Sequence, residues 1–292
     1  MSVPKRHHYV PQAHIRHFKQ NDFYELYFKN KEEFKYPRSS KDFFVKSELN
    51  TLGSDFGKDH SSFEKELAIK WDNKYNFYLK KITDVIKDQS KILEQETLKF
   101  FFEYGIIGYM RRHKMEKEFN DNYFSFTEVF PDIEEALNSY EIQNDEFSDE
   151  HLIGAREYYS AFMNEVKKMM EKQEGLKFPS IIASDARMFV PKLCSCLIYR
   201  SKKDVFVLPD STMQGLKSNK KFIWGGAEFN QIEIVGIPLT PKIYISIVNS
   251  DVNHEIKSEI INATDDMIKN INKSLILNSF DQVLFSADTI IS

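Results

Sequence analysis

The chain is poor in the residues that cross-link small secreted folds and in those that interrupt helices. Cys194 and Cys196 are its only cysteines, and an extended backbone would hold them too far apart for good disulfide geometry. Because the sequence also lacks an apolar leader and a membrane-spanning run, we expect a cytoplasmic protein without membrane association. The 10 glycines and 9 prolines, set against 25 phenylalanines and 14 tyrosines, favour a largely helical interior packed with aromatic rings.

An excess of positive charge is lacking as well, since the formal net charge of the chain is −4 at pH 7. This balance excludes the simplest kind of nucleic-acid-binding protein, one that is basic over its whole surface. The charge is nevertheless uneven, with a clearly positive stretch over residues 1–20 and a clearly acidic one over residues 131–150. A local basic patch is therefore still expected near the N-terminus.

The residues best suited to chemistry are concentrated at the beginning of the chain. Four of the eight histidines fall between positions 7 and 17, with arginines between them. Val10 precedes a proline and is therefore pushed toward extended geometry, whereas Pro11 suits the first turn of a helix. His7 and His8 would then lie just ahead of a helix N-terminus, a favourable place to hold an anion.

Hydrophobic periodicity predicts long helices in the first two thirds of the chain. One helix is expected over residues 61–87, where serine can cap its beginning and apolar residues recur along one face. A second is expected from about residue 94 to a basic cluster at residues 111–114, and a third over residues 148–174. Residues 26–28 are expected to form a short strand.

Short apolar runs separated by turn residues predict strands in the region that follows. Strands are expected at residues 196–199 and 204–208, joined by a polar turn, and again at residues 232–237 and 243–248. A final helix is expected over residues 252–277, which carry isoleucine and leucine along one side.

These elements together predict an α+β fold, with a mainly helical body and a small antiparallel sheet in the C-terminal third. A single domain is expected over residues 1–292. Its helical body would comprise about residues 1–180 and 249–292, and its sheet region about residues 187–248. The histidine-rich N-terminal segment is expected to dock near that sheet.

The opening motif also carries a family resemblance. Residues 7–12 read His-His-Tyr-Val-Pro-Gln, and Ile15, Arg16 and Phe18 follow at the expected spacing. On this motif the chain resembles a widespread bacterial family, domain of unknown function 4238. The motif is specific, and the resemblance implies one globular family without implying an established activity.

The rest of the chain supports the same resemblance. The arginine-bearing central helix of the family is similar to residues 109–113, and its Pro-Leu-Ser-Pro turn is similar to residues 238–241. The closing helix of the family carries an asparagine, and Asn262 is the residue of this chain that is similar to it. The Thr-Ser-Asp-Asn-Pro turn of the family is matched at residues 205–212 only by Asp210, which puts in doubt any role for the neighbouring hydroxyl and amide.

The sharper functional hypothesis is a phosphate-directed hydrolase, most specifically a metal-dependent nuclease. An adjacent histidine pair before a proline is superficially similar to His-Asn-His nucleases, in which one histidine binds metal and another activates water. The catalytic candidates are His7, His8 and Asp210, with His8 and Asp210 also as ligands of a divalent ion (Mg, Mn or Zn). The typical company of the family points to phage defence or a toxin-like effector. The substrate-binding candidates are Gln12, Arg16, Arg111, Arg112 and Asn262.

The alternative is a non-enzymatic binding module, whose basic N-terminal patch would engage nucleic acid or an acidic protein partner. One histidine would then anchor the N-terminus to backbone groups, and the basic cluster at residues 111–114 would only complement a helix dipole. The sequence shows no asparagine and histidine in an obvious ββα-metal arrangement. An enzyme should gather the histidines, an arginine and a carboxylate around one concave site, whereas a binding module should present an open surface.

Overall fold

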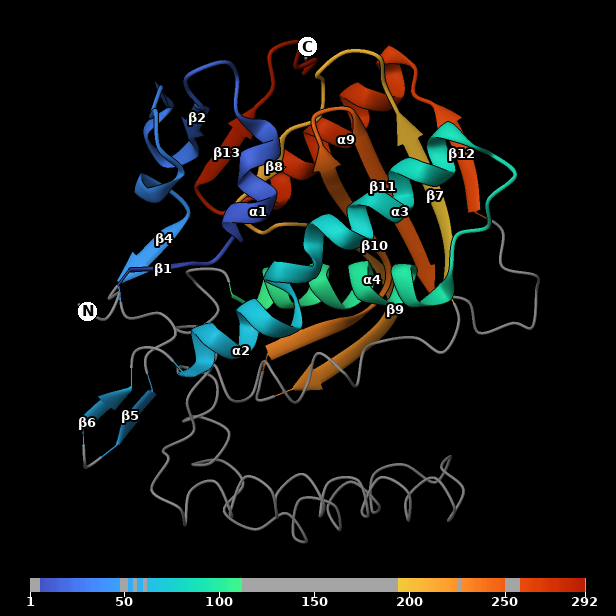
Figure 1. Cartoon of the computed structure of the whole chain (residues 1–292). Helices are drawn as coiled ribbons and strands as arrows, with labels where there is room; N and C mark the ends of the chain where they lie inside the picture. The colour runs from blue at the N-terminus through green and yellow to red at the C-terminus, as the bar shows by residue number, and fades with distance from the viewer. Residues whose placement is uncertain are drawn as a thin grey trace, which may run out of the picture.

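The structure is a computed structural model of the chain, shown in Figure 1. It describes residues 6–47, 52–54, 57–59, 62–111, 194–224, 227–249 and 258–291.

A five-stranded sheet forms the centre of the molecule, in the order β12-β7-β11-β10-β9. Neighbouring strands are antiparallel except for β12, which runs parallel to β7. In β11, Ile245 and Ile247 point to one face of the sheet and Tyr244 points to the other, as the two-residue period of a strand requires. The strands are β7 (Cys194–Arg200), β9 (Gln214–Trp224), β10 (Ala227–Thr240), β11 (Ile243–Asn249) and β12 (Ser258–Asn262).

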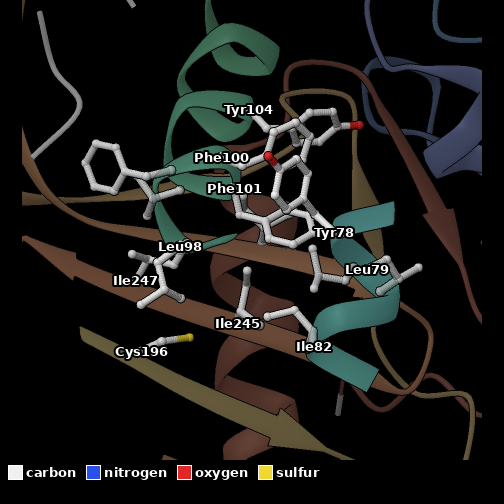
Figure 2. Packing of buried hydrophobic residues seen from close by; sticks show 14 of the residues in the cluster. Tyr78, Leu79, Ile82, Leu98, Phe100, Phe101, Tyr104, Cys196, Ile245 and Ile247 are labelled. Carbon is white, nitrogen blue, oxygen red and sulfur yellow. The ribbon is translucent and has the colours of Figure 1, made fainter. Parts of the chain in front are cut away.

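Two helices cover one face of this sheet, α3 (Tyr75–Lys87) and α4 (Gln95–Met110). Figure 2 shows Ile82 of α3 and Leu98 of α4 packed against strand residues that include Ile245. The opposite face is covered by α9 (Asp265–Asn278), whose buried residues pack in the same cluster as Tyr244. Helices therefore cover both faces of the described part of the central sheet.

Helix α4 lies unusually close to the sheet because two of its residues have no side chain. A Cβ added to Gly105 would lie 2.7 Å from Cγ1 of Val235 in β10. A Cβ added to Gly108, one turn further along, would lie 2.5 Å from Cβ of Thr212, just ahead of β9. Any larger side chain at either position would require the helix or the neighbouring side chains to shift.

The N-terminal segment contributes two of the four strands of a second sheet, in the order β3-β2-β13-β8. Its strands are β2 (Glu25–Phe28), β3 (Glu33–Lys35), β8 (Leu208–Pro209) and β13 (Gln282–Phe285), all antiparallel to their neighbours. It packs on a core that includes Tyr9, Ile15 and Phe18.

Further short elements complete the described chain. A two-stranded ribbon joins β1 (Arg6–His8) to β4 (Val45–Ser47), and a second one joins β5 (Leu52–Ser54) to β6 (Gly57–Asp59). The helical elements are α1 (Gln12–Ile15), α2 (Ser62–Lys70), and the 3-10 turns η1 (Arg16–Phe18), η2 (Lys29–Lys31), η3 (Ser40–Asp42) and η4 (Asp72–Lys74).

The predicted fold class is therefore wrong: the protein is not a mainly helical body with one small sheet. Residues 25–47 contribute β2, β3 and β4, and residues 282–285 form β13, the strand between β2 and β8 in the second sheet. These strands have three or four residues, too few for a period-two pattern to stand out among closely spaced aromatic residues. The five-stranded sheet is not purely antiparallel either, because β12 lies parallel to β7.

Individual element predictions had mixed outcomes. The helix expected from about residue 94 is α4, and the strands expected around residues 196–199, 232–237 and 243–248 lie within β7, β10 and β11. Residues 204–207 form no strand, because the turn after β7 leads away from it and β7 pairs with β11 and β12 instead.

The two other helix predictions that can be compared were only partly correct. The helix expected over residues 61–87 is interrupted at η4, and the one expected from residue 252 begins only at Asp265, because β12 precedes it. The helix expected over residues 148–174 lies outside the described residues. Cys194 and Cys196 are both free and buried, in agreement with the sequence geometry.

Candidate functional site

The two adjacent histidines of the opening motif lie on opposite sides of β1. His7 is 2% exposed, whereas His8 is only partly buried. The extended backbone is the cause, because successive side chains of a strand alternate between its two faces. Strand β1 is held in this geometry by antiparallel pairing with β4, in which His8 lies opposite Val45. The histidine pair therefore presents one imidazole, that of His8, toward the start of α1.

A hydrogen-bonded chain of three side chains runs from His8 along α1. Arg16 Nη2 donates to Gln12 Oε1 at 3.3 Å, and this bond turns the amide nitrogen of Gln12 toward His8. Gln12 Nε2 lies 2.7 Å from His8 Nε2 and donates to it. A neutral His8 ring accordingly carries its proton on Nδ1. Arg16 itself is exposed, so this series of hydrogen bonds ends in a guanidinium at the surface.

Arg111 reaches the same motif from the interior. It is the C-cap of α4, and its side chain is 1% exposed. Arg111 Nη2 donates to the backbone carbonyl oxygen of His8 at 2.6 Å, and Nη1 donates to Asp72 Oδ1 at 3.3 Å. The guanidinium expected to bind substrate thus binds groups of the protein itself in this structure.

Asp210 is buried and binds a turn of the main chain. Its Oδ1 accepts from the backbone N–H of Phe280 at 2.7 Å, and its Oδ2 accepts from those of Asp281 and Gln282, both at 2.9 Å. This turn joins α9 to β13. Burial raises the pKa of the Asp210 carboxyl, and the three N–H donors oppose that rise by stabilising the carboxylate.

The turn held by Asp210 is linked to the opening motif through Phe44. The side-chain oxygen Oε1 of Gln282 accepts from the backbone N–H of Phe44 at 3.1 Å, and Tyr9 N–H donates to the carbonyl of Phe44 at 3.0 Å. Burial raises the pKa of Tyr9 well above its usual value, and the charge of Asp210 adds to the rise. Asp210 and the motif therefore belong to one buried region, although the carboxylate oxygens themselves bind backbone donors.

His14, which we did not single out from the sequence, lies in the same segment and forms two hydrogen bonds in the interior. It is fully buried, and its Nε2 lies 2.6 Å from the carbonyl oxygen of Pro238, to which it must donate. Its Nδ1 then accepts from the hydroxyl of Tyr104 at 3.2 Å, and the ring stacks on Tyr75 at 4.7 Å between centroids. Burial lowers the pKa of His14 to about 3, so the ring is neutral. The hydroxyl of Tyr75 donates a second hydrogen bond to this segment, to the carbonyl of Leu239 at 2.5 Å.

The sequence did contain a signal for this role. His14 and Phe18 are four residues apart, which places them on one face of a helix, and Phe18 is an evident core residue. Their rings lie 5.8 Å apart in the structure. Residues 238–241, which are similar to the Pro-Leu-Ser-Pro turn of the family, include two of the carbonyl groups that receive these bonds.

Two substrate-binding candidates remain, Asn262 and Arg112. Asn262 is exposed on the edge strand β12, where its Oδ1 accepts from Arg200 Nε at 2.7 Å, on the side of the molecule away from β1 (Figure 1). The buried amide of the closing helix is instead Asn272, which donates to Val205 and Ile290 carbonyls at 2.8 and 3.0 Å. Arg112 lies outside the described residues.

Over residues 6–111 and 194–291, with their gaps, no three His, Cys, Asp or Glu side chains are grouped so that they could hold a metal ion. In the same residues no helix is both long enough and apolar enough to cross a membrane.

The fold and the site define a mixed α and β protein in which a histidine-rich N-terminal segment joins two sheets. The chain belongs to the family described as protein of unknown function (DUF4238), whose model matches residues 6–289. This match confirms the resemblance found in the opening motif. No curated protein and no solved structure matches the chain significantly.

Proposed function

We propose that the protein is a phosphate-directed hydrolase acting on nucleic acid at the surface formed by His8, Gln12 and Arg16. The observation that carries this proposal is the hydrogen-bonded chain that joins a partly buried imidazole to an exposed guanidinium. An acid–base group and a phosphate-binding group on one short stretch of chain are the minimal parts of a phosphodiester hydrolase.

Each side chain has a distinct role in this proposal. His8 is the general base in this proposal. Gln12 first breaks its hydrogen bond to His8 Nε2, and the Nε2 lone pair then accepts a proton from the attacking water. Arg16 binds the phosphate through paired N–H donors, a geometry that a guanidinium provides better than an ammonium. Gln12 connects the two, because its amide contacts both groups at once.

The divalent metal and the cellular setting are parts of the same proposal. A requirement for Mg, Mn or Zn stays a prediction, and chelation is its direct test. A cytoplasmic protein of phage defence, or a toxin-like effector, would fit an activity that cleaves nucleic acid. Comparing phage plating on bacteria that express the wild type and the His8→Ala variant tests that setting.

The decisive experiment measures cleavage of fluorogenic single-stranded RNA, single-stranded DNA and duplex DNA, each with EDTA and with Mg, Mn or Zn. We expect His8→Ala to lower kcat by about 100-fold or more, the usual contribution of a general base. His17→Ala is the matched control, since His17 lies on the same segment but bonds Asn76 instead. Equal activity of wild type and His8→Ala on every substrate would overturn the assignment.

A binding module is the second candidate, and it too has a supporting observation. Asp210 binds three backbone N–H groups, and His14 binds a backbone carbonyl and a tyrosine hydroxyl, so both serve the fold. In that case Arg16 would bind phosphates without hydrolysis. Fluorescence anisotropy with the same oligonucleotides would then show binding that weakens with salt, in a protein that cleaves none of them.

A further inference from the structure

Arg111 is almost completely buried, which is rare for an arginine side chain. Its guanidinium is 1% exposed at the C-terminal end of α4, and a buried charge is costly unless hydrogen bonds and an opposite charge compensate it. The close seating of α4 on the sheet, which Gly105 and Gly108 permit, fixes where this guanidinium lies. The end of α4 thus places two donors of Arg111, Nη1 and Nη2, beside Asp72 and the opening motif.

Those donors act on the backbone of the proposed base. Arg111 Nη2 donates to the carbonyl oxygen of His8 at 2.6 Å, a short bond that fixes the peptide plane next to the imidazole-bearing Cα. The second donor, Nη1, binds Asp72 of η4 at 3.3 Å, and the Asp72 side chain is 20% exposed. The guanidinium is therefore held between a carboxylate on one side and the carbonyl of His8 on the other.

We infer that Arg111 is a positioning residue for His8 and that Asp72 in turn orients Arg111. The catalytic consequence rests on the proposed function, whereas the effect on the His8 ring does not. Strand β1 has three residues and, among the described strands, pairs with β4 alone, and the N–H of Tyr9, just beyond β1, donates to the carbonyl of Phe44 at 3.0 Å. Arg111 binds the carbonyl oxygen of that same His8–Tyr9 peptide group, so hydrogen bonds at both its N–H and its carbonyl fix its plane.

Arg111→Lys separates positioning from simple charge. An ammonium is a point donor and cannot reproduce the planar fork that serves Asp72 and the His8 carbonyl together. We expect the variant to lower kcat by about 10- to 100-fold, as loss of a supporting contact does, with KM within about twofold of the wild type. A role confined to stability would lower the melting temperature and leave both kinetic constants of the folded protein unchanged.

The second readout is independent of activity. Histidine side-chain ¹H–¹⁵N spectra of the full chain report the tautomer of each ring, with His8 assigned by its loss in His8→Gln. We expect Arg111→Lys to shift the His8 signals and weaken the Nδ1–H preference, while the signals of buried His14 stay in place. Arg38→Lys, a change at an exposed arginine, is the control and should leave the His8 signals unchanged.

Asp72→Asn provides a second test of the positioning role if the Arg111→Lys variant does not fold. It keeps an acceptor for Arg111 but removes its charge, and we expect a smaller shift of the His8 signals in the same direction. Unchanged His8 signals in a folded variant would overturn the inference, even if His8→Ala abolished hydrolysis. Shifted signals in a protein that hydrolyses no substrate would support the positioning role and overturn the proposed function alone.

Discussion

At the scale of single residues, the opening motif separates into side chains that serve the fold and side chains that face outward. His14 binds Pro238 and Tyr104 in the interior, whereas His8 contacts Gln12 near the surface. Spacing alone could not make this distinction, because it depends on which segments pack against α1. A histidine cluster in a sequence is therefore a mixed signal, even when one member carries the chemistry.

Asp210 offers a test at this scale. Asp210→Asn replaces one carboxylate oxygen by an NH₂ group, which then faces a backbone N–H, donor against donor, at the turn before β13. We expect the free energy of unfolding to fall by about 2–4 kcal/mol, because buried donors lose their acceptor. Urea unfolding measures the change.

The control for this prediction is Asp22→Asn, a change at an exposed carboxylate that should stay within about 0.5 kcal/mol of the wild type. An equally small effect of Asp210→Asn would show that the three N–H bonds contribute little to stability.

At the scale of elements, helix α4 connects the core to the proposed site. Its first residue, Gln95, binds both the N–H and the carbonyl of Cys194 at 2.9 and 2.8 Å, and its C-cap, Arg111, binds the carbonyl of His8. The glycines between these ends let the helix lie against β10 and Thr212. The two glycines of α4 lower its helix propensity, but they allow the helix to pack closely against the sheet.

Gly108→Ala tests this seating. Alanine favours a helix by about 1 kcal/mol over glycine, but its Cβ would lie 2.5 Å from Thr212, so we expect a net destabilisation of about 1–3 kcal/mol. Thr212 has a φ of 65°, which is strained for a branched side chain. Thr212→Gly should therefore restore much of the loss in the double variant, and the deviation from additivity is measured in a double-mutant cycle. Strictly additive effects would contradict the contact.

At the scale of the whole molecule, His14 holds the N-terminal segment against α3, α4 and the end of β10. Its folded-state pKa of about 3 lies below the unfolded value near 6.5, so the unfolded chain binds a proton more readily. The stability due to the neutral ring is complete above about pH 6.5 and decreases as pH falls toward 3. The decrease between pH 6.5 and 4 should reach about 3 kcal/mol.

A matched pair of variants isolates this effect from other acid-titrating groups. His14→Gln should be less stable at neutral pH but should lose less stability on acidification than the wild type. His17→Gln, at a partly exposed neighbour, should keep the wild-type slope. Identical slopes of unfolding free energy against pH for His14→Gln and the wild type would contradict the neutral buried ring.

The sequence by itself determined the parts of this protein that depend on local pattern. The extended lead to His8, the start of α4 near residue 94 and the strands within β7, β10 and β11 follow from Pro11, from period-3.6 apolar residues and from short apolar runs. The family followed from residues 7–12 and was confirmed over residues 6–289.

The tertiary structure alone decided which distant segments pair. The parallel pairing of β12 with β7 and the pairing of β13 with both β2 and β8 join residues that no local period connects. The same holds for the site, where Arg111 meets a carbonyl 103 positions away and Asp210 meets N–H groups 70 to 72 positions away. Hydrogen bonds to backbone groups carry no residue identity at the acceptor or donor, so their partners leave no trace in the sequence.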